Sequence, residues 1–199
     1  MKLNKDNFVI GVTGGVGSGK STVLDILREE YGAVVLRADD IGRAVIEPGG
    51  AGYEKVKELF GKEALRPDGR PDRAYIAGKM FADPSLTEAM NEIVHPAVRK
   101  VLEESARSCR GLLVLEAALP EGGGFREICD EIWYVYVRRE ERIARLIASR
   151  GYSRRKCADI MSRQLSVSEF RKLADRVIDN NGTREETASQ VRSILKKIL

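Results

Sequence analysis

Short apolar runs alternate along the chain with segments whose apolar residues recur at helical spacing. The runs predict five buried strands, over residues 8–13, 32–38, 112–115, 131–137 and 176–178. The periodic segments predict helices over residues 21–31, 39–47, 140–149, 153–174 and 185–198. Strands that alternate with helices indicate a parallel sheet covered on both faces. We therefore expect a three-layer α/β/α fold around a central parallel sheet of about five strands.

The segment between the second and third predicted strands is different, because little in it reads as strand. Residues 53–108 have a helical pattern broken by turn signals at Pro67-Asp68-Gly69, Asp83-Pro84 and His95-Pro96. We interpret this block as a helical insertion that carries substrate specificity. The chain then reads as one unit with a core of residues 1–40, 111–139 and 175–199, a helical substrate subdomain of residues 41–110 and a helical lid of residues 140–174.

The loop after the first strand carries the most specific chemistry in the sequence. Residues 14–21 read Gly-Gly-Val-Gly-Ser-Gly-Lys-Ser and fit G-x-x-x-x-G-K-[ST], the phosphate-binding loop of nucleotide hydrolases and kinases. Its glycines let successive backbone N–H groups converge on phosphate oxygens. Lys20 would bring a positive charge to the β- and γ-phosphates, and Ser21 a hydroxyl ligand for Mg²⁺. The loop predicts that the chain binds a nucleoside triphosphate.

Composition indicates the class of protein and its compartment, but not its function. The chain has 199 residues, 43% of them hydrophobic and 32% charged, which is ordinary for a soluble globular protein. No apolar run approaches the ~18 residues of a membrane span, and the first residues lack the apolar stretch of a signal peptide. Three scattered cysteines without a C-x-x-C pair argue against disulfides or a zinc site and favour a reducing cytoplasm.

The basic residues allow more than one interpretation. A formal net charge of +4 fits either a nucleic-acid partner or a polyphosphate substrate. Because few aromatic residues are interleaved with the basic ones, we expect no nucleic acid. The basic run over residues 138–156 is either a solvated helix face or part of a mobile lid whose arginines close over phosphates. In a regular helix, Arg138, Arg142 and Arg145 would share a face, with Arg150 about 100° away.

Three further side chains are candidates for chemistry, each with a structural alternative. Asp39 follows the second strand, where it would take the proton of an acceptor hydroxyl, cap the next helix, or do both. Glu116 ends the third strand and would either hold Mg²⁺ through water or be an exposed strand-end carboxylate. His95 is the only histidine, and its place before Pro96 favours a helix boundary or a core hydrogen bond over direct chemistry.

Beyond the loop, short motifs follow one another in a set order along almost the whole chain. The most specific are Phe-Ala-Asp-Pro at residues 81–84 and Asn-Glu-Ile-Val-His-Pro at residues 91–96. The others are residues 13–22, Ala38-Asp39 with Arg43, Pro48-Gly49, Phe60-Gly61, Asp68-Gly69, Asp72-Arg73, Arg145-Leu146, Arg150-Gly151, Gln164, Ala174-Asp175 and residues 178–182. In their order and spacing these motifs resemble the dephospho-coenzyme A kinase family.

The resemblance implies a P-loop kinase fold and a reaction. ATP with Mg²⁺ would phosphorylate the ribose 3′-hydroxyl of dephospho-coenzyme A, the last step of coenzyme A biosynthesis. ATP and dephospho-coenzyme A are then the expected partners of a cytoplasmic enzyme that contacts no membrane, and we expect a monomer, with an oligomer left open.

The resemblance also implies roles for individual residues. The catalytic residues would be Asp39, Lys20 and the lid arginine Arg150, with Ser21 as the Mg²⁺ ligand. The acceptor site would comprise Arg43, Arg73, His95 and Glu116. The ATP site would comprise Gly14, Gly15, Gly17, Ser18, Gly19, Lys20, Ser21 and Thr22, with Asn180 and Gly182 bordering the adenine.

Two departures from the family pattern lie near these residues. Arg37 stands where the family usually has an acid, two residues before Asp39. After the third strand the family usually reads Asp-Val-Pro-Leu-Leu-Phe-Glu, whereas this chain reads Glu-Ala-Ala-Leu-Pro-Glu from residue 116 and then three glycines. This altered loop keeps open a nucleoside or nucleotide kinase of the same fold with a different acceptor. A GTP-dependent switch or a nucleic-acid-binding ATPase is supported only by Asn4-Lys5-Asp6, which precedes the phosphate loop.

Overall fold

The computed structural model describes residues 7–117 and 124–198, which form two compact units. The first unit contains the described residues up to Leu36 and from Ala106 onward, and the second contains Arg37–Ser105. Most of the altered loop after the third strand, at residues 118–123, lies outside the described residues, and so does the triplet Asn4-Lys5-Asp6.

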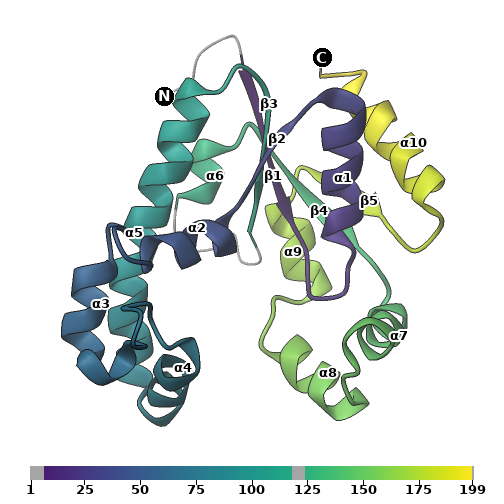
Figure 1. Ribbon diagram of the computed structural model, residues 1–199. Coiled ribbons are helices and arrows are strands. Elements are labelled where there is room, and N and C mark those ends of the chain that lie inside the picture. Colours follow the sequence, from purple (N-terminus) through teal and green to yellow (C-terminus); the bar gives the residue numbers. More distant parts are fainter. Residues whose placement is uncertain (1–6, 118–123, 199) are drawn as a thin grey trace. The chain divides into compact units, whose positions relative to one another are not determined.

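The first unit is built on a five-stranded sheet of order β2-β3-β1-β4-β5 (Figure 1). The central strand β1 (Asn7–Thr13) pairs in parallel with β3 (Gly111–Glu116) and β4 (Glu131–Tyr136), and β4 pairs in parallel with β5 (Arg176–Asp179). The edge strand β2 (Val34–Arg37) lies next to β3. The prediction of a central parallel sheet of about five strands is confirmed.

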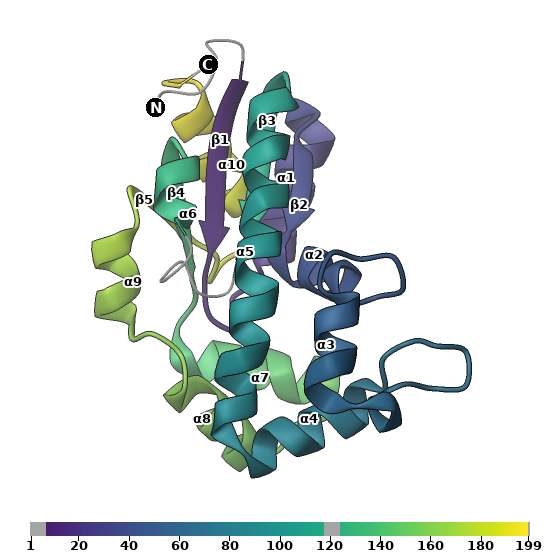
Figure 2. The same ribbon diagram turned by 90° about the vertical axis from the view of Figure 1, so that its left-hand side faces the viewer.

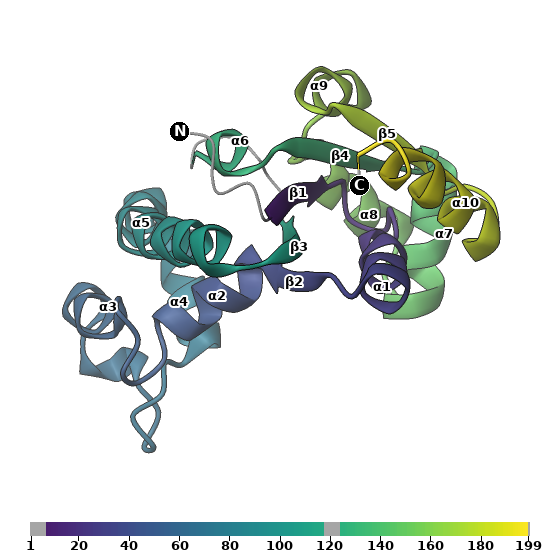
Figure 3. The same ribbon diagram turned by 90° about the horizontal axis from the view of Figure 1, so that it is seen from above.

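Helices cover both faces of this sheet. Seen from above (Figure 3), α1 (Lys20–Tyr31) and α10 (Arg184–Leu195) lie on one face, and α6 (Phe125–Ile128) and α9 (Val167–Leu173) on the other. The alternation of side chains along β1 explains this division. Ile10 and Val12 are fully buried in the same apolar cluster as residues of α1 and α10. On the opposite face, a Cβ at Gly11 would lie 2.6 Å from the Phe125 ring, so α6 can pack there only against a glycine.

The second unit is helical, apart from an isolated antiparallel bridge between Leu65 and Pro71. It contains α2 (Ala38–Val45), α3 (Tyr53–Phe60), α4 (Arg73–Ala82) and most of α5 (Pro84–Ser108), which are labelled in Figure 2, and the short 3-10 helix η1 (Lys62–Ala64). Its own apolar core contains Val45, Ile46, Val56, Phe60, Ala64, Ile76 and Met90. Among the described residues no helix combines the length and the apolar character needed to cross a membrane.

The helix boundary expected at His95-Pro96 is wrong, because α5 runs through it for 25 residues. Proline removes one backbone hydrogen bond, and its ring strains the preceding turn at a cost of about 3 kcal/mol. Here Pro96 is on the exposed face of α5, where the Glu92 carbonyl can bond water instead. The helix is also held on both sides, since Met90 before the proline and Leu102 after it are buried.

The single helix expected over residues 153–174 is also wrong, since two helices occupy this segment. After α7 (Arg139–Arg150), the chain forms α8 (Arg154–Ser162), breaks, and starts again as α9. The break has a local cause. Ser166 accepts a hydrogen bond from the backbone N–H of Glu169, and Glu169 accepts one from the backbone N–H of Ser166. This capping box was readable in the sequence as Ser-x-x-Glu.

Acid should weaken one polar contact that ties β4 to β5. The Asp175 carboxylate accepts a hydrogen bond from the backbone N–H of Ile132, at 2.7 Å, and two from the Arg126 guanidinium. The hydrogen bonds and charge of Arg126, together with the Ile132 N–H, hold the pKa of Asp175 below its usual value. A carboxyl whose pKa is lowered in the folded state stabilises that state above its unfolded pKa of about 3.9, and the effect disappears as the pH falls through the folded pKa.

We therefore expect Asp175→Asn to lower the free energy of unfolding by about 1–2 kcal/mol at pH 7, the range for a charge-assisted hydrogen bond that is partly exposed. The difference from the unmodified chain should shrink below about pH 4, where Asp175 of the unfolded chain becomes protonated, and disappear only as the pH falls through the lower pKa of the folded state. Urea unfolding followed by circular dichroism at pH 7 and pH 3 measures both values, with the exposed Asp159→Asn as the control. An equal difference at both pH values would contradict the prediction.

Candidate functional site

The residues of the phosphate-loop motif connect β1 to α1 in the first unit. Gly14, Gly17 and Gly19 have φ angles of +153°, +76° and +77°, which side chains rarely allow. The Ser18 N–H donates to the Gly15 carbonyl at 3.1 Å and closes the turn. A Cβ at Gly19 would overlap the amide nitrogen of Asn180. Two features therefore require glycine at position 19: the positive φ angle of its backbone and the close approach of the Asn180 side chain.

The start of α1 is suited to an anion. Gly19 is its N-cap and offers no side-chain hydrogen bond, and the first turn contains no acidic residue. The first N–H groups of a helix have no partner within the helix, and the helix dipole makes this end positive. The Ser18 hydroxyl, which lies against Gly14, is buried with no hydrogen-bond partner among the described residues. This combination fits a phosphate group bound at the loop.

Lys20 lies over the loop that precedes it. Its ammonium group donates to the Gly14 carbonyl at 2.9 Å and lies 3.5 Å from the Glu116 carboxylate at the end of β3. Both side chains are mostly buried, with 15% and 21% of their surfaces exposed. Ser21, the predicted Mg²⁺ ligand, is exposed. The backbone N–H of Thr22 donates to the Gly19 carbonyl as part of the first turn.

Arg142 of α7 and Gln164, between α8 and α9, hold the loop through side-chain hydrogen bonds. The Arg142 guanidinium donates to the Val16 carbonyl at 2.8 Å, and the Gln164 side-chain oxygen accepts from the Val16 N–H at 3.1 Å. Arg142 also donates to Gln164. Burial lowers the pKa of Arg142, yet an arginine stays charged at neutral pH. A buried cation whose hydrogen-bond acceptors among the described residues are neutral favours an anion nearby.

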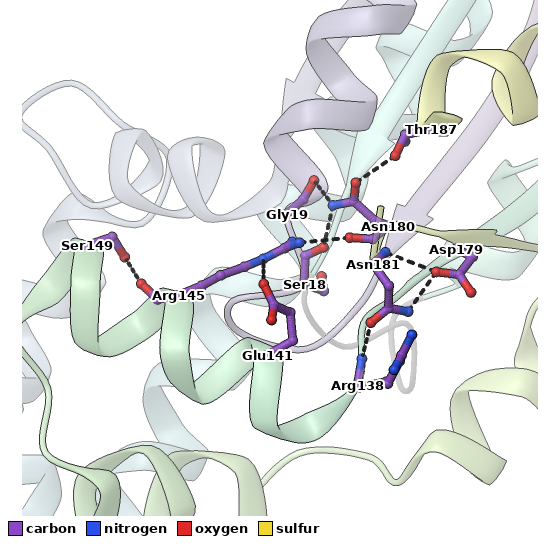
Figure 4. A network of polar contacts seen from close by, with 10 residues as sticks. All are labelled: Ser18, Gly19, Arg138, Glu141, Arg145, Ser149, Asp179, Asn180, Asn181 and Thr187. Carbon is purple, nitrogen blue, oxygen red and sulfur yellow. Dashed lines mark hydrogen bonds and ion pairs between the residues drawn. The ribbon is translucent and has the colours of Figure 1, made fainter. Parts of the chain in front are cut away.

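A second contact joins α7 to the loop through the residues that follow β5 (Figure 4). Arg145 donates to the Asn180 carbonyl at 2.9 Å, and the Asn180 amide donates to the Ser18 carbonyl at 2.8 Å. The Asn181 side chain accepts from the backbone N–H of Arg138 at the start of α7. Gly182, the other residue predicted to border the adenine, is exposed.

Arg150 is separate from these contacts. It is the last residue of α7, is exposed, and places its guanidinium 5.9 Å from the centre of the Tyr152 ring. The spacing predicted a shared helix face for Arg138, Arg142 and Arg145. Arg138 is the N-cap that precedes α7, and the side chains of Arg142 and Arg145 contact the loop or the residues beside it.

The remaining candidates lie in the second unit. Asp39 is exposed in the first turn of α2, whose N-cap is Arg37, so Asp39 is not the cap of this helix. Arg43 pairs with Asp40 at 3.3 Å. Arg73 pairs with Glu47 at 2.6 Å and borders an apolar cavity of about 470 Å³ lined by Ile46, Ile76, Ala77, Met80, Phe81, Thr87 and Met90. His95 is on the exposed face of α5. These residues stay predictions as acceptor contacts.

Sequence reasoning missed two partners in this site. Thr187 was not singled out, although its hydroxyl bonds the buried Asn180 side chain. Gln164 was noted only as a motif match, and its contact with Val16 spans 148 residues. Contacts at such separation leave no periodic or local signal in one sequence. What the first unit offers chemically is a glycine loop, a lysine and a buried arginine arranged to hold a polyphosphate.

The chain is similar to known proteins in both sequence and structure. The family model described as dephospho-CoA kinase matches residues 8–186. A dephospho-CoA kinase of Carboxydothermus hydrogenoformans is 40% identical, with 95% of this chain and 93% of the relative covered. A dephospho-CoA kinase of Geobacter sulfurreducens is 39% identical, with 95% of this chain and 98% of that relative covered.

Solved structures show the same similarity. The structure of TT1252 from Thermus thermophilus is similar at a TM-score of 0.83 and 34% identity, with 98% of this chain and 100% of that chain covered. A dephospho-CoA kinase from Campylobacter jejuni is similar at a TM-score of 0.65 and 20% identity, with 96% and 97% covered, and at that identity it supports the fold alone.

Proposed function

Because the chain belongs to the dephospho-CoA kinase family, we propose that it transfers the γ-phosphate of ATP to the ribose 3′-hydroxyl of dephospho-coenzyme A and so forms coenzyme A. The observation that carries this proposal is the extent of the family match. Residues 8–186 include the phosphate loop, the helical second unit and residues 140–174, so the match covers every segment to which we assign a donor or acceptor role.

On the donor side, the N–H groups at the start of α1 bind the β- and γ-phosphates of ATP. The ammonium group of Lys20 leaves the Gly14 carbonyl and stabilises the charge that develops during transfer. Arg142, buried beside the loop, supplies a second positive charge. Arg150 reaches the phosphates when the lid closes. Residues 180–182 border the adenine, with Gly182 exposed to it.

Mg²⁺ fits this donor site. Magnesium prefers oxygen ligands and usually takes only one or two from the protein, since water and phosphate oxygens supply the rest. The exposed Ser21 hydroxyl at the start of α1 and the Glu116 carboxylate beside Lys20 are oxygen donors of the right kind. Ser21 would bind the ion directly, and Glu116 through water. When bound with ATP, the ion offsets negative charge on the phosphates.

On the acceptor side, Asp39 takes the proton of the 3′-hydroxyl. The 3′-oxygen forms a bond to the γ-phosphorus while the bond from that phosphorus to the β,γ-bridging oxygen breaks, and ADP leaves. The exposed Asp39 carboxylate has no hydrogen-bond partner within its own unit and can accept this proton. Arg43, Arg73 and His95 hold the acceptor.

The proposed setting follows from the substrates and from the cysteines. ATP and an acceptor that ends in a thiol both belong in the reducing cytoplasm, which also suits scattered cysteines without a C-x-x-C pair. We also propose a monomer, as expected from the sequence, with an oligomer left open.

A comparison of acceptors tests the function. With ATP and Mg²⁺, dephospho-coenzyme A should stimulate ADP release far more than adenosine, AMP or DNA does. Coenzyme A is the matched control, because its 3′-oxygen already carries a phosphate and cannot attack. If a nucleoside or a nucleoside monophosphate is the better acceptor, the proposal is wrong and the altered loop after β3 marks a different specificity.

A further inference from the structure

Asn180 is a buried polar side chain beside the phosphate loop, and both ends of its amide are hydrogen-bonded. It follows β5, and its own N–H donates to the Tyr136 carbonyl at 2.9 Å, which continues the pairing with β4. Only 4% of its surface is exposed. Figure 4 shows its side chain between the loop and Thr187, with Arg145 reaching its carbonyl from α7.

The hydrogen-bond partners determine which way the Asn180 amide faces. The carbonyl oxygens of Ser18 and Gly19 lie 2.8 Å and 3.4 Å from Nδ2, and both can only accept, so the NH₂ group must face them. The Asn180 Oδ1 then faces the Thr187 hydroxyl, which donates to it at 2.8 Å. Thr187 is fully buried in α10. Both N–H donors of the Asn180 amide therefore face carbonyl groups of the loop.

Bonds to these two carbonyls also orient two N–H groups. A trans peptide is planar, so its C=O and N–H groups point in opposite directions. The N–H of Gly19 shares a peptide plane with the Ser18 carbonyl, and the N–H of Lys20 shares one with the Gly19 carbonyl. When Asn180 holds both carbonyls on one side, both N–H groups point to the other. The left-handed conformation of Gly19 brings successive N–H groups together into a concave anion site.

We propose that Asn180 is a positioning residue of the donor site, aligned by Thr187, which presets the Gly19 and Lys20 N–H groups for the phosphates of ATP. The proposal rests on the proposed function only in taking ATP as the donor. Arg145 adds a link to α7, because it binds the carbonyl of the same residue. The side chain of Asn180 acts from behind the loop, so Asn180 takes part in the proposed border with the adenine through its backbone alone, beside residues 181 and 182.

The affinity for ATP, measured by calorimetry without any acceptor, tests this role. Asn180→Ala should weaken ATP binding about tenfold or more, since a lost buried hydrogen bond of this kind corresponds to roughly that factor. Thr187→Val keeps the shape of the side chain but removes the donor that aligns the amide, and should weaken binding about three- to tenfold. Thr187→Ser should restore near-normal affinity. The KM for dephospho-coenzyme A should be unchanged in all three.

Gln190 provides the matched control. It lies on the same helix as Thr187 and binds the backbone N–H and carbonyl of Asp179, next to Asn180, at 2.9 Å and 2.8 Å. Gln190→Ala should lower stability but leave the ATP affinity within about twofold, because it loses bonds of similar strength away from the loop. If folded Asn180→Ala or Thr187→Val binds ATP normally, or if Gln190→Ala weakens binding equally, the positioning role is wrong. Because the ATP affinities are measured without an acceptor, they do not depend on the acceptor's identity.

Discussion

Asp39→Asn is expected to lower the turnover of dephospho-coenzyme A at least ~100-fold while ATP still binds, because a positioned general base contributes about 10²–10⁴ to the rate. Asparagine has the same shape but cannot take a proton. Asp39 belongs to the second unit, whereas the loop, Lys20 and Arg142 belong to the first, so the substitution should leave the donor contacts intact. Initial rates of ADP release and the dissociation constant of ATP, measured on the same preparation, separate the two effects.

The adjacent Asp40 is the natural control for this prediction. It is exposed in the same turn of α2 and pairs with Arg43 at 3.3 Å, an interaction three residues apart that is worth about 0.2–0.5 kcal/mol. Asp40→Asn should therefore leave turnover within about threefold. Normal turnover in Asp39→Asn would remove Asp39 from the chemistry. It would also leave no role as an N-cap, since Arg37 occupies that position.

The parts of the molecule that sequence reasoning predicted well are those with local causes. The phosphate loop requires glycines because its own backbone turns through positive φ angles at Gly14, Gly17 and Gly19. Strands such as β1 and β4 are apolar over most of their length because helices cover both faces of the sheet. In each case a short stretch of sequence carries the signal, a glycine pattern or an apolar run, even where distant residues contribute to its cause.

The rest depended on packing that a single sequence does not display. Pro96 predicts a helix end by itself, yet buried residues on either side keep α5 continuous. The spacing of the arginines predicted a shared face for Arg142 and Arg145, but not which partner each would find. Asn180 was expected to contact the nucleotide, and its engagement with Ser18 joins residues 162 positions apart.

Lys20→Met should have the largest effect on the donor side, in both ATP affinity and rate. Methionine is similarly long and unbranched, so the change removes mainly the charge. We expect turnover to fall about 10²–10³-fold, as when one preorganised donor to a transition state is lost, and ATP binding to weaken at least tenfold. Ligand binding stabilises a protein by RT ln(1 + [L]/Kd), so the rise in melting temperature caused by ATP should largely disappear.

The contact between Lys20 and Glu116 makes this prediction more specific. The ammonium group lies 2.9 Å from the Gly14 carbonyl and 3.5 Å from the Glu116 carboxylate, and it has to exchange these partners for phosphate oxygens. Glu116→Gln removes the competing charge but keeps Lys20. If Glu116 only holds the lysine, Glu116→Gln should bind ATP without Mg²⁺ at least as tightly as the unmodified chain does. If Glu116 also holds magnesium through water, its turnover should fall when the ion is present.

Lys57→Met is the control for the loss of a lysine as such. Lys57 pairs with Glu54 on α3 in the second unit and is partly exposed, so its removal should leave ATP affinity and turnover within about twofold. Normal ATP affinity and turnover in Lys20→Met would contradict the proposed donor site. A fall in affinity with normal turnover at saturating ATP would assign Lys20 to ground-state binding alone. An interaction raises turnover at saturating ATP only if it is stronger in the transition state than in the bound substrate. A role of Lys20 in stabilising the transition state therefore requires that the turnover of Lys20→Met falls.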